Sequence, residues 1–463
     1  MLETEPQKRR LRDSAVVKMV IIGVLVLILL IPLAMVGSLV SERQSRQREV
    51  AREVAVSWGR PQVLAGPVLT VPYLVHFKGE KGVVTTQTTY ARFLPETLKV
   101  EGNVDGERLN RGIFEVAVYR TGLKWTGTFQ RPSFEEWHVA PEDVVWRDAY
   151  LAIGVPDMRG ITSGVDLTWG TRTLGLVPGG GEPGLWPSGL KVQIPDLAAG
   201  KANEAYAFAF DLGVNGSEGL SFLPLGKETT VALKSNWPAP SFKGEFLPAR
   251  RTVSGTGFDA LWHVSWFGRS SYPQQWRESE AQELAPQAAI ESSAFGVGLF
   301  MPVDAYQKTE RSTKYGVLFL VLTFLTFFLY EQFNPFSLHP VQYLLVGFAL
   351  CLFYLLLLSI SEHAPFGVAY LTAAAATVLL IGGYSVAILR GALRALLMTV
   401  VLGTLYGYLY VLLQLEDYAL LLGSIGLFLI LGLVMYLTRR IDWSAPRRGS
   451  TPPPLVTAAV TQP

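Results

Sequence analysis

The chain has 463 residues, of which 49% are hydrophobic and 17% are charged. Soluble globular domains carry roughly 25% charged residues, so this composition indicates a membrane protein. The net charge of +2 gives no sign of nucleic-acid binding. The one cysteine, Cys351, lies in an apolar run, which excludes a disulfide in the rest of the chain.

Six apolar runs are long enough to cross a bilayer, whose hydrocarbon core of about 30 Å takes roughly 20 helical residues. They are residues 16–40, 315–330, 341–360, 366–389, 395–414 and 418–437. Basic residues precede the first run, as in a signal peptide, but about 25 apolar residues exceed the apolar region of a cleaved signal. The first run is therefore predicted to be an uncleaved membrane anchor.

The Lys and Arg residues of the short connections predict the orientation, because basic residues near helix ends stay in the cytoplasm. Basic residues collect before the first run, between the fourth and fifth runs, and after the sixth. The two short connections on the opposite side contain none. We therefore expect both termini inside the cell and residues 41–314 outside the membrane.

Residues 41–314 are predicted to form one large antiparallel, all-β, sandwich-like domain. Val50, Val54 and Trp58 recur every fourth residue, which suggests a helical stalk before it or an ordinary first helix of the domain. From Val68 to about Phe267 the hydrophobic period is two, with Gly, Pro and Asn between the runs. The strand candidates are Val68–Phe77, Val83–Phe93, Ile113–Tyr119, Trp146–Val155, Ala205–Leu212, Thr229–Leu233 and Phe258–Phe267.

The expected organisation therefore has five parts. Residues 1–15 form a cytoplasmic N-terminus, and residues 16–40 form the first transmembrane helix. Residues 41–314 form the β-rich domain, and residues 315–437 form a five-helix transmembrane domain. Residues 438–463 form a cytoplasmic tail, which is expected to be partly disordered because it is rich in Pro and Thr.

Long segments of the chain resemble the CreD family of bacterial inner membrane proteins. The likeness runs from about residue 15 to residue 440. The membrane segments that carry it are HPVQYLLVGFALCLFYLLLLSISEH (339–363), AYLTAAAATVLLIGGY (369–384) and KYGVLFLVLTFLTFFLYE (314–331). The segments outside the membrane are WGRPQVLAGPVLTVPY (58–73), RFLPETLKVEG (92–102), RGIFEVAVY (111–119) and GVPDMRGI (154–161).

This resemblance implies a multi-pass inner membrane protein with a periplasmic domain and a role in cell-envelope integrity and stress response. The family is tied to a two-component regulatory system and to tolerance of envelope-directed agents such as colicins and β-lactams. The resemblance implies no reaction and no cofactor. The expected partners are the lipid bilayer and other envelope components, and the oligomeric state stays open.

The sequence contains none of the common enzyme signatures, such as a phosphate-binding loop, an HExxH zinc helix or a GxSxG nucleophile. No ionisable residue is expected at mid-depth in the six spans, which argues against an ion pump. The neutral polar residues of the spans can form interhelical hydrogen bonds. They are Tyr354, Thr372, Thr377, Tyr384, Ser385, Tyr406, Tyr408, Tyr410 and Gln414. Gly403 and Gly407 form a GxxxG pair that would let two helices approach closely.

Two groups of charged residues at helix ends are candidate sites. Glu362 and His363 end the third span, on the same side of the membrane as Glu416 and Asp417. This cluster is expected either to bind a metal or substrate, or to be a wetted helix end. Glu331 and His339 border an inner connection and could contact a cytoplasmic partner.

Three functions follow from these observations. The first is a non-enzymatic protein that supports the envelope through contacts of its β-domain. The second is a transporter or a membrane-embedded enzyme acting on an envelope lipid, with Glu362, His363, Glu416 and Asp417 lining its site. The third is a sensor, which would need a separate output partner. We expect no catalytic residue, cofactor or metal, and the second function stays an alternative.

The predicted orientation can be tested with alkaline phosphatase, which is active only outside the cytoplasm. A fusion after Gly200 should be active, because residues 41–314 are expected outside. A fusion after Arg440 should be inactive, and activity there would overturn the orientation.

Overall fold

The computed structural model describes residues 15–78, 84–179, 186–195, 197, 204–269, 272–280, 286–301, 305–333, 337–389, 391–415 and 418–439. The chain divides into two compact units. The helical unit comprises Met1–Ser45 and Val303–Pro463, and the β unit comprises Arg46–Pro302. The first long helix belongs in part to each.

The described helices confirm the prediction of one apolar helix before the β-rich domain and five after it. They are α2 (Ala15–Trp58), α4 (Pro286–Ser292), α5 (Ala305–Phe333), α6 (Pro340–Ser361), α7 (Phe366–Ile388), α8 (Ala392–Gln414) and α9 (Ala419–Thr438). All except α4 are long and apolar enough to cross a membrane. The helix α2 continues through the residues for which a stalk was predicted.

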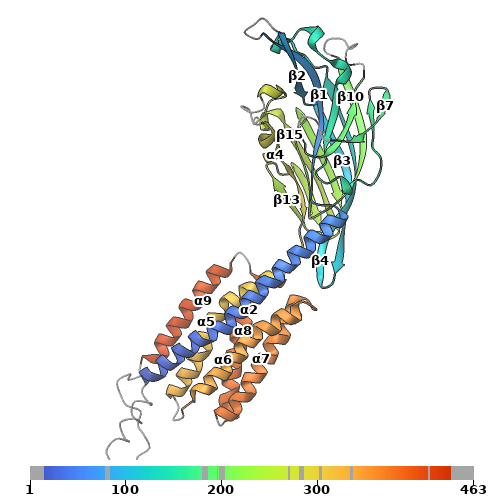
Figure 1. Cartoon of the computed structure of the whole chain (residues 1–463). Coiled ribbons are helices and arrows are strands. Elements are labelled where there is room, and N and C mark those ends of the chain that lie inside the picture. The colour runs from blue at the N-terminus through green and yellow to red at the C-terminus, as the bar shows by residue number, and fades with distance from the viewer. Residues whose placement is uncertain are drawn as a thin grey trace, which may run out of the picture. The chain divides into compact units, whose positions relative to one another are not determined.

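In the helical unit, α5, α6, α7 and α8 lie side by side (Figure 1). The first part of α2 packs against this group through Leu29, which is fully buried. A Cβ on Gly347 of α6 would lie 2.1 Å from a Leu29 methyl carbon, so any larger residue would force the Leu29 side chain to shift. Phe353 is also fully buried, and its ring centroid lies 4.6 Å from that of Tyr406.

One prediction about helix packing was wrong. A Cβ on Gly403 or Gly407 would meet no atom within 4 Å, so this pair brings no described helix close. The hydroxyls of Thr372, Thr377 and Ser385 donate to carbonyls four residues earlier in their own helix, and Thr377 also forms a side-chain hydrogen bond with Tyr406 of α8. A helix offers a hydroxyl this local acceptor at every turn, so no neighbour is needed.

The predicted interhelical hydrogen bonds are confirmed at Tyr408 and Gln414. Tyr370 of α7 donates to the backbone oxygen of Tyr406 in α8, at 2.7 Å. Tyr408 of α8 donates to the backbone oxygen of Leu422 in α9. A tyrosine hydroxyl is carried about one ring length from its own backbone, so it reaches the neighbouring helix.

The β unit contains two sheets, as the predicted sandwich requires. The first sheet contains β1 (Gln62–Lys78), β2 (Val84–Phe93), β5 (Tyr150–Gly154), β8 (Val177–Pro178), β9 (Gly189–Gln193), β11 (Gly219–Phe222), β13 (Pro240–Gly244), β16 (Gln275–Arg277) and β17 (Phe295–Leu299). The second contains β3 (Thr97–Arg111), β4 (Phe114–Gln130), β6 (Asp166–Trp169), β7 (Arg172–Gly175), β10 (Ala205–Ser217), β12 (Glu228–Ser235), β14 (Arg250–Ser254) and β15 (Gly257–Ser265). Each of the seven predicted strand segments overlaps one of these strands.

Most strand pairs are antiparallel, as predicted, but two are parallel. The start of β1 pairs in parallel with β11, where Gln62 lies opposite Leu220. β3 pairs in parallel with β12, where Thr97 lies opposite Glu228. Each parallel pair joins strands far apart in the sequence, so no tight turn dictates their relative direction.

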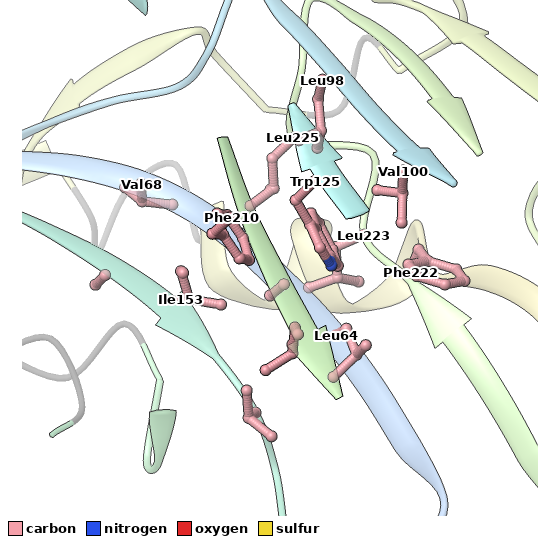
Figure 2. Packing of buried hydrophobic residues seen from close by; sticks show 14 of the residues in the cluster. Leu64, Val68, Leu98, Val100, Trp125, Ile153, Phe210, Phe222, Leu223 and Leu225 are labelled. Atoms are coloured by element: carbon pink, nitrogen blue, oxygen red, sulfur yellow. The ribbon is translucent and has the colours of Figure 1, made fainter. Parts of the chain in front are cut away.

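The two sheets enclose one hydrophobic core (Figure 2). Trp125 of β4 is 1% exposed and stacks on Phe210 of β10, with ring centroids 5.5 Å apart. The same indole lies 5.9 Å from the ring of Phe222, which belongs to the other sheet. Alternate residues of β4, such as Lys124, point to solvent. The period-two pattern therefore places hydrophobic side chains on the core face of the strand and polar side chains on its solvent face.

Replacing Trp125 by Ala should destabilise the β unit by about 3–5 kcal/mol, because a buried aromatic side chain leaves a cavity. The melting temperature of the purified chain should then fall by roughly 10 °C. Lys124→Ala is the matched control on the solvent face of the same strand, and it should change stability by less than about 0.5 kcal/mol. Equal melting temperatures for the two variants would contradict this description of the core.

Candidate functional site

The carboxylate of Glu362, at the end of α6, joins three helices of the helical unit. Its Oε1 accepts a hydrogen bond from the Tyr306 hydroxyl at 3.2 Å and lies 3.5 Å from Nε of Arg43. The Glu362 side chain is only 11% exposed. Tyr306 belongs to α5 and Arg43 to α2. Glu362 therefore already has protein partners and helps to hold the helix ends together.

The structure describes two of the four residues of the predicted outer cluster, Glu362 and His363. His363 follows Glu362 on the chain, is exposed, and has its Nδ1 3.2 Å from the Ser359 oxygen. Glu416 and Asp417 lie outside the described residues. Within the residues that are described, no three His, Cys, Asp or Glu side chains gather as metal ligands would. The structure thus places Glu362 and His363 at one helix end without testing the larger cluster.

Glu331, the first residue of the second predicted group, is fully buried near the end of α5. Its Oε1 forms an ion pair with Nζ of Lys18 in α2. Its Oε2 accepts a hydrogen bond from the Tyr343 hydroxyl of α6, at 3.1 Å. Lys18 also donates to the hydroxyl of Ser337, at 2.6 Å. This inner cluster, Lys18–Glu331–Tyr343–Ser337, links α2 to α5 and α6.

His339, the other residue of the second predicted group, lies at the start of α6, and its predicted contact with a cytoplasmic partner stays a prediction. It is the N-cap of α6, and its Nδ1 accepts a hydrogen bond from the Val341 backbone N–H at 3.3 Å. The Gln342 side chain accepts from the His339 backbone N–H at 2.9 Å, which completes a capping box. These contacts satisfy donors at the start of the helix.

A second group of contacts, in the β unit, fixes the end of α2 to the sheets. Trp58 donates its indole N–H to the Tyr119 backbone oxygen at 3.3 Å, and the Arg120 guanidinium lies 4.8 Å from the same indole ring. Glu53, one turn earlier, pairs with Arg111 at 2.9 Å. Gly59 then ends the helix at φ +144°, where a Cβ would lie 2.5 Å from the Asn215 oxygen.

A buried carboxylate holds the chain just beyond this helix end. Asp157 is 6% exposed and accepts hydrogen bonds from Nε and Nη2 of Arg159 at 2.9 and 3.0 Å. It also accepts the backbone N–H of Arg60, at 3.1 Å. The Arg159 guanidinium, helped by these N–H groups, lowers the pKa of Asp157 below its usual value. We name the contacts of Glu53, Trp58, Gly59 and Asp157 the α2 junction.

Sequence reasoning found Glu331 and Glu362 but missed their partners and the α2 junction. In the sequence, Lys18 is only one of the basic residues that predict the orientation of the first span. Its position inside an apolar helix was the available signal, since a charge there needs a counter-charge. The segment GVPDMRGI contributed to the resemblance, but nothing in its letters indicates that Asp157 contacts Arg60.

The chain matches the family described as inner membrane protein CreD over residues 14–444. It is also 36% identical over 431 residues to the inner membrane protein CreD of Escherichia coli (strain K12). That alignment covers 91% of this chain and 92% of the relative.

The inner cluster generates a stability prediction. Lys18→Met removes the counter-charge of a fully buried carboxylate, which should destabilise the helical unit by about 3–5 kcal/mol. Adding Glu331→Gln to Lys18→Met should restore most of this loss, because the unpaired charge is gone. Thermal unfolding of the purified variants in detergent measures both effects.

Arg43→Met is the control, because it breaks an ion pair of the same helix whose arginine is 44% exposed. It should cost no more than about 1 kcal/mol. A double variant as unstable as Lys18→Met alone would show that the pair does not act as proposed.

Proposed function

The chain belongs to the CreD family of inner membrane proteins, and from this premise we propose that it supports cell-envelope integrity without catalysing a reaction. Its β-domain contacts other envelope components, and its helices anchor that domain in the membrane. The role includes tolerance of envelope-directed agents. We further propose that both termini are cytoplasmic and that the β-domain is periplasmic.

The observation that carries this proposal is the way α2 is held in both units. The helix runs without interruption from Ala15 to Trp58. In the helical unit it is bound through the buried pair of Lys18 with Glu331 and through Arg43 with Glu362. In the β unit it is bound through the α2 junction. A helix that anchors a domain to the membrane must be attached at both of its ends, because otherwise the domain or the anchor could move independently of it.

Catalysis at the helix end is less well supported. The Glu362 carboxylate is largely buried and already accepts from Tyr306, so it is poorly placed to abstract a proton from a substrate. A groove of about 200 Å³ lies between α5, α8 and α9, but neither Glu362 nor His363 lines it. Its lining is almost entirely apolar. No Asp, Glu, His, Lys or Arg side chain among the described residues lines this groove.

A sensor is the second candidate, and the same helix favours it. Because α2 is bound in each unit, a change in how the β unit holds Trp58 would act on the helix that carries Lys18. Such a signal would still require a partner with an output domain.

The proposal predicts mild effects at the helix end. Glu362→Gln and His363→Ala should each complement a strain lacking this protein in an assay of tolerance to envelope-directed agents. His363 is exposed, so its replacement should cost within about 0.5 kcal/mol. Glu362→Gln keeps an oxygen that can accept from Tyr306 and loses only the ion pair with the half-exposed Arg43, about 1 kcal/mol or less, so abundance should stay close to normal. Replacing residues 60–301 by a short flexible linker should abolish complementation.

Protein abundance must be measured beside complementation in each strain. Complete loss of tolerance in Glu362→Gln or His363→Ala at normal abundance would contradict the non-enzymatic proposal and favour a site at this helix end. Full tolerance without residues 60–301 would show that the β-domain is not the functional part.

A further inference from the structure

An apolar groove lies between α5, α8 and α9. Its volume is about 200 Å³. α5 contributes Tyr315, Leu318 and Leu322, α8 contributes Tyr408, and α9 contributes Leu427 among others. All three helices are long and apolar enough to cross a membrane. Inside a bilayer such a groove is filled by hydrocarbon rather than by water.

The groove extends to one end of the helical unit, because its lining reaches the end of α8, the start of α9 and the start of the apolar part of α5. Tyr315 and Leu322 belong to the first two-thirds of α5, Leu412 lies two residues before the end of α8, and Ala419 is the first residue of α9. Lys308 of α5 donates to the Gln414 side chain at the end of α8, at 3.3 Å. The groove therefore opens near the level where these helix ends leave the hydrocarbon.

Basic residues of α5 lie at this opening. Lys314 precedes Leu318 by four residues, which puts it on the same helix face as the lining, one turn nearer the helix start. Its side chain is 71% exposed and pairs with Glu310 at 2.8 Å. An exposed pair of this kind is weak, so the ammonium group can also pair with a phosphate. Lys308 lies two turns earlier on the same helix.

We propose that this groove binds one acyl chain of an anionic glycerophospholipid, whose phosphate pairs with Lys314. The apolar lining accounts for the chain, and the exposed ammonium group of Lys314 accounts for the headgroup, because opposite charges attract across a few ångströms at the membrane surface. The lipid is a bound structural partner and undergoes no reaction. A second copy of the chain is the other possible occupant of the groove, and the experiment below distinguishes it.

The experiment is native mass spectrometry of the purified full-length chain in detergent, titrated with dioleoyl phosphatidylglycerol. The wild-type chain should remain a monomer and retain one phosphatidylglycerol. Gly423→Phe should weaken this binding by about tenfold or more, because the ring fills space that otherwise buries at least two methylene groups. A Cβ at Gly423 meets no atom within 4 Å, so the change fits without a clash.

Gly432→Phe is the matched control. It makes the same substitution in the same helix, also with no atom within 4 Å of the added Cβ, but Gly432 does not line the groove. It should bind phosphatidylglycerol as the wild type does. Equal binding by the two phenylalanine variants, or a wild-type dimer without lipid, would overturn the proposal.

Lys314→Gln tests the headgroup without altering the groove. It should weaken phosphatidylglycerol binding on the order of fivefold, as expected from the loss of one lysine at a membrane surface. Binding of dioleoyl phosphatidylcholine, which has the same chains and no net charge, should be weaker than that of phosphatidylglycerol and should not change. Equal affinity of the wild type for the two lipids would overturn the assignment of an anionic headgroup.

Discussion

A buried carboxylate constrains the whole helical unit. Glu331 has no exposed surface, and a charge in that position is tolerated only beside a counter-charge and hydrogen-bond donors. The counter-charge comes from Lys18, more than 300 residues away in the sequence, and a donor comes from Tyr343. The N-terminal helix is therefore an obligatory member of the bundle and not only an anchor.

Helices and strands were predicted where one-dimensional signals are strong. A run of about 20 apolar residues has few meanings other than a membrane span, so all six spans were found. Their ends were less certain: α5 begins at Ala305, ten residues before its apolar run, because a helix continues into polar sequence such as Lys308–Lys314. β3 was missed because Gly102, Asn103 and Gly106 resemble a turn, although Val100 and Val104 alternate as a strand does.

The site was predictable only in part, for a physical reason. Charged residues at the ends of apolar runs are visible in the sequence, which is why Glu331 and Glu362 were singled out. Their partners depend on which helices become neighbours, and the sequence does not show this. The GxxxG pair Gly403 and Gly407 predicted a close helix contact where the described helices make none. The close approach occurs at Gly347, against Leu29, and a single glycine in an apolar helix carries no such signal. Lys314, which we propose binds a lipid phosphate, lies in the part of α5 that hydropathy alone assigned to the β-rich domain.

The parallel pairing of β1 with β11 also has a consequence for the order of events during synthesis. β1 follows directly after α2, so it emerges early, yet Gln62 pairs with Leu220 and β11 in turn pairs with β17 near the end of the unit. The first residues of β1, Gln62–Leu64, must therefore stay unpaired until β11 has been made, although Leu69–Lys78 can pair with β2 as soon as that strand follows. Nascent chains of this kind expose an aggregation-prone edge while they are still attached to the ribosome. Demand for a holding chaperone should thus be greatest before Phe222, the last residue of β11, has been made.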